Sequence, residues 1–188
     1  MINNQLIQVY NTTLNGGVVI AGNSLQVVGS KNDLSLEFIK SDGSYTFDWR
    51  QNGSTAYLDV PSGSSVIYAL LQWFGTMSNS NTSLSNSEQY SLVTFQTPNG
   101  TFNVSYQNEF QFSVNNELYS SKYADVTNYV NVVGEGYYTL KGVPSVNPVA
   151  NIDNNNKACW VLSVVYQLPS LPFRDISLYC GLKQAIIL

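Results

Sequence analysis

Cys159 and Cys180 are the side chains of this chain most able to form a covalent bond. They stand at the outer ends of two β-branched and aromatic runs that flank a proline-containing turn at 169–172, a pattern that predicts a long β-hairpin. Aligning Leu162 with Leu178 matches apolar residues best, but it sends the two sulfurs to opposite faces. Since a disulfide needs closely placed β-carbons, this register favours two free thiols and leaves an intramolecular or inter-subunit bond as alternatives.

Signatures of enzymes and of cofactor sites are missing from the sequence. The chain has no histidine for a general base or a zinc site, no Gly-rich phosphate loop and no Gly-x-Ser-x-Gly elbow. The tract that begins at Asp153 lacks the glycine and the distal glutamate of a calcium loop. We therefore predict no catalytic residue, no cofactor and no metal. Carboxylates distant in sequence could still meet in space, but their spacing does not indicate a pair: Asp48, Asp59, Glu88, Glu109, Glu117 and Glu135.

Four residues are expected to have structural roles. Trp73 and Trp160 lie in apolar runs, where large aromatic side chains usually belong to the core. Asp125 is placed to cap a short helix, and capping alone accounts for it. Arg174 is a charge within an apolar motif, so we expect it to form an ion pair or to bind backbone carbonyls.

A binding role would require exposed aromatic side chains at loop tips. The candidates for contact with a carbohydrate or a host matrix are Trp49, Tyr106 and Tyr119. A lysine–asparagine isopeptide bond through Lys40 or Lys141 is a further possibility, as some Gram-positive surface sandwiches carry. Its formation would remove ammonia from the mass of the chain.

The composition predicts a protein that works outside a cell. Only 11% of the 188 residues are charged, so Asn, Ser, Thr, Gln and Gly supply the polar surface; AT-rich codon usage is the competing explanation. The net charge is −4 and the basic residues are scattered from Lys31 to Lys183, which disfavours nucleic-acid binding. No apolar run is long enough to span a bilayer, and the first ten residues lack a secretory leader. The apolar ending at 185–188 suggests a fragment of a longer protein.

Short apolar runs bounded by turn residues recur along the chain and predict an all-β fold. The expected strands are 17–28, 34–39, 44–49, 55–60, 66–74, 91–96, 101–106 and 110–114. Asn-Gly pairs at 15–16, 52–53 and 99–100 are typical of turns, and the last predicts a hairpin. Segment 66–74 is apolar on both faces and so should be a central strand, whereas 76–89 and 143–157 are expected to be loops.

One segment departs from this pattern. Asp125, the apolar spacing that follows it, and Gly134 predict a short helix over 125–133 that covers the sandwich. The β-branched residues of this segment make a strand the alternative.

Four motifs in the same order resemble one known family. They are Val66, Ala69, Leu71, Trp73 and Gly75; Tyr123 to Thr127 with Val130; Gly134, Gly136 and Tyr138 to Leu140; and Trp160, Leu162 and Val164 to Tyr166 followed by Pro169 to Pro172, Arg174 and Ile176 to Leu178. Together with the opening 15–25, they resemble the N-terminal domain of the large, repeat-rich cell-surface or spore-surface proteins of Gram-positive spore-forming bacteria. The resemblance implies a surface location and supplies no catalytic residues.

These observations predict one antiparallel β-sandwich over residues 1–188, jelly-roll-like, with one short helix near 125–133. The expected function is that of a non-enzymatic structural module of a bacterial cell surface or spore surface, within an appendage, a surface layer or an adhesin. Its partners would be other surface-protein subunits or copies of itself, which could join through edge strands. The alternative is an adhesin domain that binds carbohydrate or host matrix; a hydrolase is the least favoured class.

Overall fold

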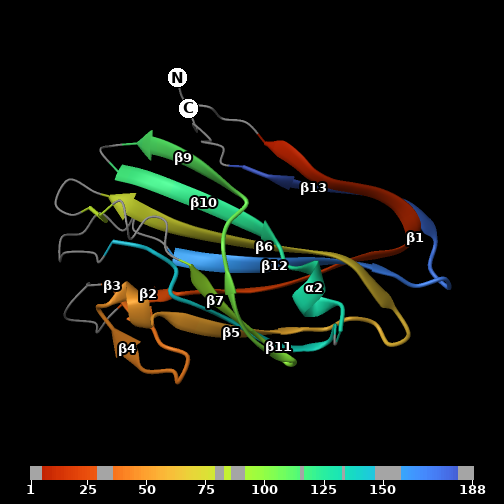
Figure 1. Cartoon of the computed structure of the whole chain (residues 1–188), viewed down its shortest axis with the longest axis horizontal. Coiled ribbons are helices and arrows are strands. Elements are labelled where there is room, and N and C mark those ends of the chain that lie inside the picture. Colours follow the sequence, from red (N-terminus) through yellow and green to blue (C-terminus); the bar gives the residue numbers. More distant parts are fainter. Residues whose placement is uncertain are drawn as a thin grey trace.

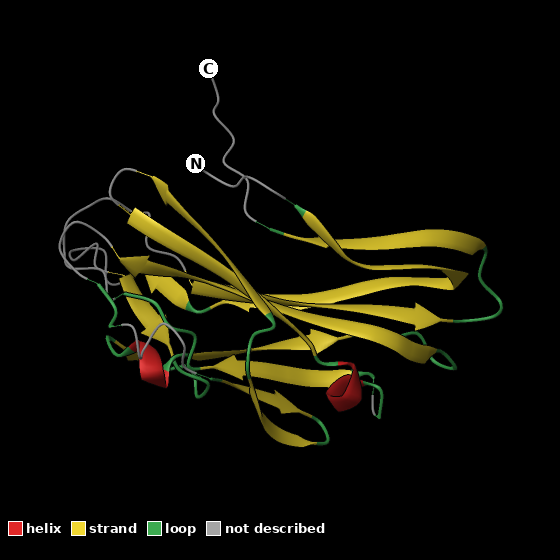
Figure 2. Ribbon diagram, turned by 45° about the horizontal axis from the view of Figure 1, so that its top comes forward, coloured by secondary structure: helices red, strands yellow, loops and turns green. Residues whose placement is uncertain are grey.

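A computed structural model describes residues 6–28, 36–78, 83–85, 92–114, 117–132, 134–146 and 158–181. The predicted all-β antiparallel sandwich is confirmed (Figures 1 and 2). A six-stranded sheet has the order β13 (Phe173–Cys180), β1 (Ile7–Ser24), β12 (Ala158–Gln167), β6 (Ser65–Ser78), β10 (Glu117–Asp125) and β9 (Asn108–Val114). A four-stranded sheet has the order β5 (Gly53–Leu58), β11 (Gly136–Lys141), β7 (Val93–Thr97) and β8 (Gly100–Val104). The third sheet joins β2 (Gln26–Val28), β3 (Leu36–Ile39) and β4 (Tyr45–Thr46).

The six-stranded sheet is curled, and the two halves of its longest strand, β1, pair with different neighbours. The first part of β1 pairs with β13 from Ile7 to Asn15, and the second part pairs with β12 from Gly16 to Ser24. Figure 1 shows β1 and β13 turning over the outer face of β6 and β12, so that this sheet forms a half-barrel.

The main core lies between the six-stranded and the four-stranded sheets. Alternation along β6 directs Ala69, Leu71 and Trp73 into this core, as expected for a central strand covered on both faces. They belong to the same buried cluster as Phe95 and Tyr138 of the opposite sheet. The other face of the large sheet carries a smaller group, which we call the outer cluster: Leu14, Val165 and Ile176, flanked by Tyr10, Tyr68 and Leu178.

The predicted hairpin between residues 159 and 180 is wrong. β12 and β13 follow each other in sequence, but β1 lies between them and pairs with both. The alignment of Leu162 with Leu178 compared only two segments that are close in sequence. In the structure both segments pair with β1, from the other end of the chain. The expected strand 17–28 began too late because residues 7–14 alternate with polar side chains, and it ends earlier, with β2 forming a separate short strand.

The three Asn-Gly pairs have three different roles. The predicted hairpin at 99–100 is confirmed, with β7 paired to β8 and Gly100 at φ 151°. Asn15 and Gly16 lie inside β1, where a side chain on Gly16 would overlap the carbonyl oxygen of Tyr166. Asn52 has φ −63° and is fully buried, so it forms no turn of positive φ. The glycine at 16 therefore serves a close approach between strands.

The helix is present but short. α2 covers Thr127–Val130, four residues within the predicted 125–133, because the β-branched side chains around it favour extended backbone. Of the expected strand 44–49, only β4 (Tyr45–Thr46) forms, and a 3-10 helix, η1 (Trp49–Gln51), begins at its last residue. The sequence prediction missed β10 and β11, and it placed the end of β6 in a loop although that strand continues to Ser78. The expected loop 147–157 lies outside the described residues.

Candidate functional site

The residues with expected structural roles occupy two kinds of environment. Trp73 and Trp160 are buried, and Trp160 Nε1 donates to Ser54 Oγ at 2.9 Å, which joins the two sheets. Asp125 lies one residue before the helix N-cap, and its carboxylate accepts the backbone N–H of Thr127 at 2.9 Å. Arg174 is exposed on β13, and its side chain forms neither the expected ion pair nor the expected contact with backbone carbonyls among the described residues.

The aromatic residues expected at loop tips do not provide exposed ring faces. Trp49 and Tyr119 are 7% and 6% exposed, and Tyr106 is half-buried beside the Nζ of Lys122. Tyr119 lies in β10, where it stacks on Phe112 at 4.9 Å between ring centroids. The prediction of ligand contact is therefore wrong for Trp49, which the 3-10 helix η1 buries, and for Tyr119, which strand alternation on β10 turns onto Phe112. Tyr106, which follows β8, is only half-buried.

Neither Cys159 nor Cys180 forms a disulfide bond with a described residue. Cys180 is buried at the end of β13, and burial raises the pKa of its thiol to about 12. Cys159 is half-buried on β12, and β1 separates the two strands. An intramolecular disulfide is therefore not formed in this structure.

An isopeptide bond through Lys40 or Lys141 stays a prediction. Lys40 and Lys141 are half-buried, and neither side chain forms a hydrogen bond or an ion pair with the described part of the chain. The buried cation is Lys122, whose Nζ lies 3.5 Å from Glu109 Oε1 on the neighbouring strand. Burial lowers the pKa of Lys122, and the Glu109 carboxylate opposes that change. This pair lies on the inner face of the six-stranded sheet, where both side chains are largely shielded from solvent.

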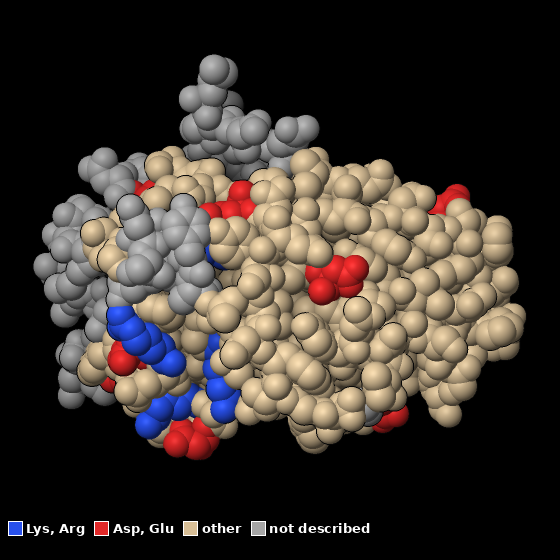
Figure 3. All heavy atoms as spheres, viewed as in Figure 1, with Lys and Arg blue, Asp and Glu red and all other residues tan. Residues whose placement is uncertain are grey.

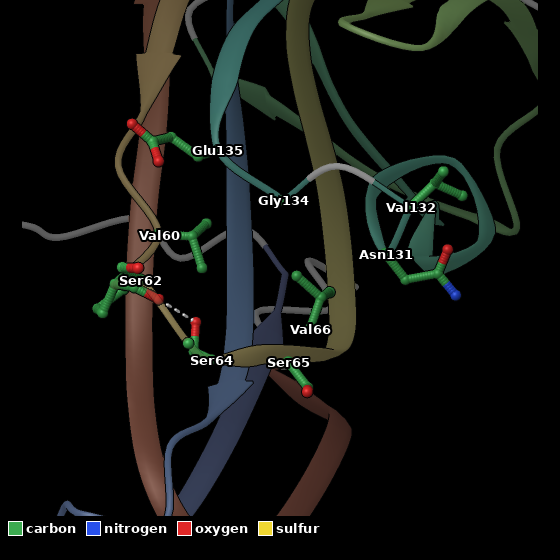
Figure 4. Close-up of a pocket in the computed structure, with 11 residues that line it drawn as sticks. Val60, Ser62, Ser64, Ser65, Val66, Asn131, Val132, Gly134 and Glu135 are labelled. Atoms are coloured by element: carbon green, nitrogen blue, oxygen red, sulfur yellow. Dashed lines mark hydrogen bonds between the residues drawn. The ribbon is translucent and has the colours of Figure 1, made fainter.

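A hollow at the end of the sandwich is the best candidate for a binding site. Its volume is about 470 Å³, within the ~300–1,000 Å³ common for ligand pockets. One wall is the 60–66 turn between β5 and β6, and the other is formed by residues 131, 132, 134 and 135 between α2 and β11. Figure 4 shows Val60 and Val66 in the floor between these walls, with Gly134 beside them. Gly134 has φ 68°, which lets the backbone turn closely past both valines.

Short polar side chains surround this hollow. Ser64 Oγ donates to the carbonyl of Pro61 at 2.6 Å and so stabilises the 60–66 turn (Figure 4). The hydroxyls of Ser62 and Ser65 and the amide of Asn131 are exposed, and they form no hydrogen bond with the described residues. The hollow therefore offers donors and acceptors over a small apolar floor.

Two exposed tyrosines adjoin the Glu135 side of the hollow. Tyr57 and Tyr137 are directly opposite each other on β5 and β11, with ring centroids 5.0 Å apart in an edge-on arrangement. Their exposed fractions are 47% and 69%, which is high for such large side chains. The Tyr57 hydroxyl donates to Glu135 Oε1, and this hydrogen bond, with smaller contributions from Asp59, raises the pKa of Tyr57 to about 12. Glu135 thus holds one ring in place and lines the hollow.

The arrangement offers hydrogen-bonding groups and exposed aromatic rings to a ligand. No group of three or more possible metal ligands occurs among the described residues. The two walls contribute hydroxyls, one amide and one carboxylate, and the tyrosines add two flat apolar surfaces. Alternation on β5 and β11 indicates that residues 57 and 137 share a face, but only the structure brings the 131–135 segment beside them.

None of the helices in the described ranges has the length and hydropathy needed to cross a membrane. Comparison with protein-family models, with curated proteins and with solved structures found no match to this chain.

Proposed function

We propose that this chain is a non-enzymatic, extracellular module of a bacterial cell-surface or spore-surface protein and that it binds neutral glycans. The observation that carries the glycan proposal is the exposed pair Tyr57 and Tyr137 beside a hollow lined by Ser62, Ser65 and Asn131. The surface location rests on the sequence, through its scarcity of charge and its resemblance to surface proteins.

The chemistry of the hollow matches that of a sugar. One face of a pyranose ring presents C–H groups, which pack well on the electron-rich face of an aromatic ring. The ring edge presents hydroxyls, which serine hydroxyls and an asparagine amide bind as both donors and acceptors. Figure 3 shows a face of the molecule that is largely uncharged, with lysine and arginine gathered near the end that carries β3 and β4. A neutral ligand suits such a surface better than an anion does.

A glycan array probed with the purified chain tests the proposal, followed by titration calorimetry on the glycan retained most strongly. Replacing Tyr137 with alanine should weaken binding at least tenfold, about 1.4 kcal/mol, because it removes the most exposed ring of the pair. The matched control is Tyr45→Ala, since Tyr45 is 57% exposed and lies in β4 at the opposite end of the sandwich (Figure 1).

Retention of no glycan on the array would refute the proposal. It would also fail if Tyr45→Ala and Tyr137→Ala reduced the affinity equally, because the loss would then not belong to the hollow.

A second candidate function, that of a structural subunit, is favoured by one observation. Strand β9 presents a free edge with no charged side chain directed to solvent.

A further inference from the structure

Strand β9 is an unprotected edge of the large sheet. It covers Asn108–Val114, seven residues, and within the described ranges only β10 pairs with it. In Figure 1, β9 lies at the outer border of the sheet, beside β10. Its one charged residue, Glu109, turns inward to Lys122 and accepts a hydrogen bond from Ser120 Oγ at 2.5 Å. Natural edges are often protected by charged side chains, including inward-pointing ones, by a proline or by a bulge. On β9 the inward charge of Glu109 is paired with Lys122, and no charged side chain points to solvent.

The direction of the free backbone groups follows from one hydrogen bond. The N–H of Glu109 donates to Asn108 Oδ1 at 2.8 Å, so it points away from β10. In an antiparallel pair, residues two apart on a strand share the same orientation, so the N–H groups of Gln111 and Ser113 also point outward. These residues are exposed, which leaves a row of donors and acceptors available at the middle of the strand.

The other edges of the two main sheets are less suited to pairing. β13 carries the charged side chains of Arg174 and Asp175, and Thr13 Oγ1 binds the Asp175 carboxylate at 2.6 Å. β8 is five residues long and begins at the glycine of a tight turn. β5, the remaining edge, has six residues and no charge, but the carbonyl of Thr55 already accepts from Asn23 Nδ2 at 3.0 Å. Of these four edges, β9 is the longest that carries no charge toward solvent.

We propose that β9 is a self-association edge, which pairs antiparallel with β9 of a second copy of this chain about a two-fold axis at Gln111. In that register the outward N–H and C=O groups of Gln111 face the same groups of the second copy. Phe110 then lies opposite Phe112 of the second copy, on the face where both rings are half-buried. Residues directly opposite in a sheet contact each other, so the pairing adds aromatic contacts to main-chain hydrogen bonds.

The expected partner is a second copy because the edge is complementary to itself. A two-fold axis at the centre of β9 pairs its seven residues without an overhang and brings no like charges together. A contact of one strand pair is small, so the dimer should be weak and should dissociate on dilution. The proposal does not depend on the glycan site, which lies at the 60–66 turn.

Sedimentation velocity on the intact chain over a hundredfold concentration range tests this directly. The unmodified chain should shift from monomer to dimer as its concentration rises. Gln111→Pro should abolish the dimer, because it removes an outward N–H and leaves the β9–β10 hydrogen bonds intact. The matched control Gln111→Ala should retain the dimer, because it keeps the backbone groups.

A second variant guards against misfolding of the proline variant. In Gln111→Lys, two lysines would meet at the two-fold axis, so the dimer should be lost at low salt and partly recovered at high salt. Circular dichroism should match that of the unmodified chain in all three variants. A chain that stays monomeric throughout the range, or a dimer that survives both Gln111→Pro and Gln111→Lys, would overturn the proposal.

Discussion

The two faces of the six-stranded sheet are stabilised by different kinds of contact. On the inner face, two buried polar groups have specific partners, Lys122 with Glu109 and Trp160 with Ser54, whereas the buried Nε1 of Trp73 forms no hydrogen bond with a described residue. On the outer face, tyrosine and phenylalanine rings stack in pairs, and apart from the buried Tyr119 these rings are half-buried. The stack of Tyr10 on Tyr68, with centroids 4.1 Å apart and planes 2° from parallel, is the tightest of these.

This difference indicates how each face should respond to mutation. A buried polar atom that loses its partner has no water to replace it, so the free energy of unfolding falls by the full desolvation penalty. A half-exposed ring loses only its contact, because its hydroxyl already reaches solvent. Substitutions on the inner face should therefore lower the free energy of unfolding more than substitutions on the outer face.

The largest effect is expected for Glu109→Ala. It removes the carboxylate that lies against Lys122, a side chain only 1% exposed, and should lower the free energy of unfolding by about 3 kcal/mol. Denaturant unfolding followed by tryptophan fluorescence measures this. The double variant Glu109→Leu/Lys122→Met should recover most of the loss, because no buried charge remains. A loss below about 0.5 kcal/mol for Glu109→Ala would contradict the expectation that stability depends strongly on this inner-face contact.

A somewhat smaller effect is expected for Asn52→Ala. The Asn52 side chain is fully buried, with its Nδ2 donating to the carbonyl of Val143 at 2.9 Å and its Oδ1 accepting the Val143 N–H at 3.0 Å. Loss of both bonds should reduce stability by about 2–3 kcal/mol. The control is Asn23→Ala, in which an exposed amide loses its bond to the carbonyl of Thr55. Equal losses in thermal or denaturant unfolding would contradict the role of burial.

The outer face should respond less to the loss of a ring contact. Tyr10→Leu removes the stack on Tyr68 but keeps an apolar side chain, so we expect a loss of about 1 kcal/mol. Tyr138→Leu, in the core on the opposite sheet, should lose more, because the Tyr138 hydroxyl also donates to the carbonyl of Gly134 at 2.7 Å. The same unfolding assay ranks the pair, and a larger loss for Tyr10→Leu would reverse the comparison.

The smallest effect is on titration at high pH. Tyr57 and Tyr138 both have a pKa raised to about 12, the first mainly by the Glu135 hydrogen bond and the second by burial. Because the neutral forms are favoured in the fold, their contribution to stability is present below pH 10 and is lost as the pH rises toward 12. Glu135→Gln should lower the pKa of Tyr57 toward 10 and leave Tyr138 unchanged. Ultraviolet absorbance titration with Tyr57→Phe as reference separates the two, and a Tyr57 pKa that stays near 12 in Glu135→Gln would exclude this cause.

The sequence predicted the local features of the fold better than its long-range pairings. Alternation along 66–74 correctly indicated a central strand with two apolar faces, and the Asn99–Gly100 turn correctly indicated a hairpin. The partner of 159–168 could not be predicted in this way, because β1 comes from the opposite end of the chain and begins with alternating polar residues. Arg174 was expected inside for the same reason, since its surroundings in sequence are apolar while its strand lies at an edge.

The candidate site was harder to predict than the fold. Aromatic residues near turns were expected to be exposed, but Trp49 and Tyr119 pack against other side chains. The exposed pair, Tyr57 and Tyr137, lies on two strands that are distant in sequence, and β11 was not predicted at all. A weak signal was present in the alternation of the two strands. Tyr57 and Tyr137 each precede an apolar residue, Leu58 and Tyr138, that is buried on the other face of its strand.

The pairing of β1 with β13 also determines how the molecule would respond to tension. Ile7 and Cys180 are opposite each other, so the first residue of β1 and the last of β13 lie at the same end of the sheet (Figure 1). A pulling force applied at these two points would load the ladder one hydrogen bond at a time, like opening a zipper, and not all of them together. We expect the β1–β13 ribbon to peel at low force, while β6 and β12 behind it stay joined.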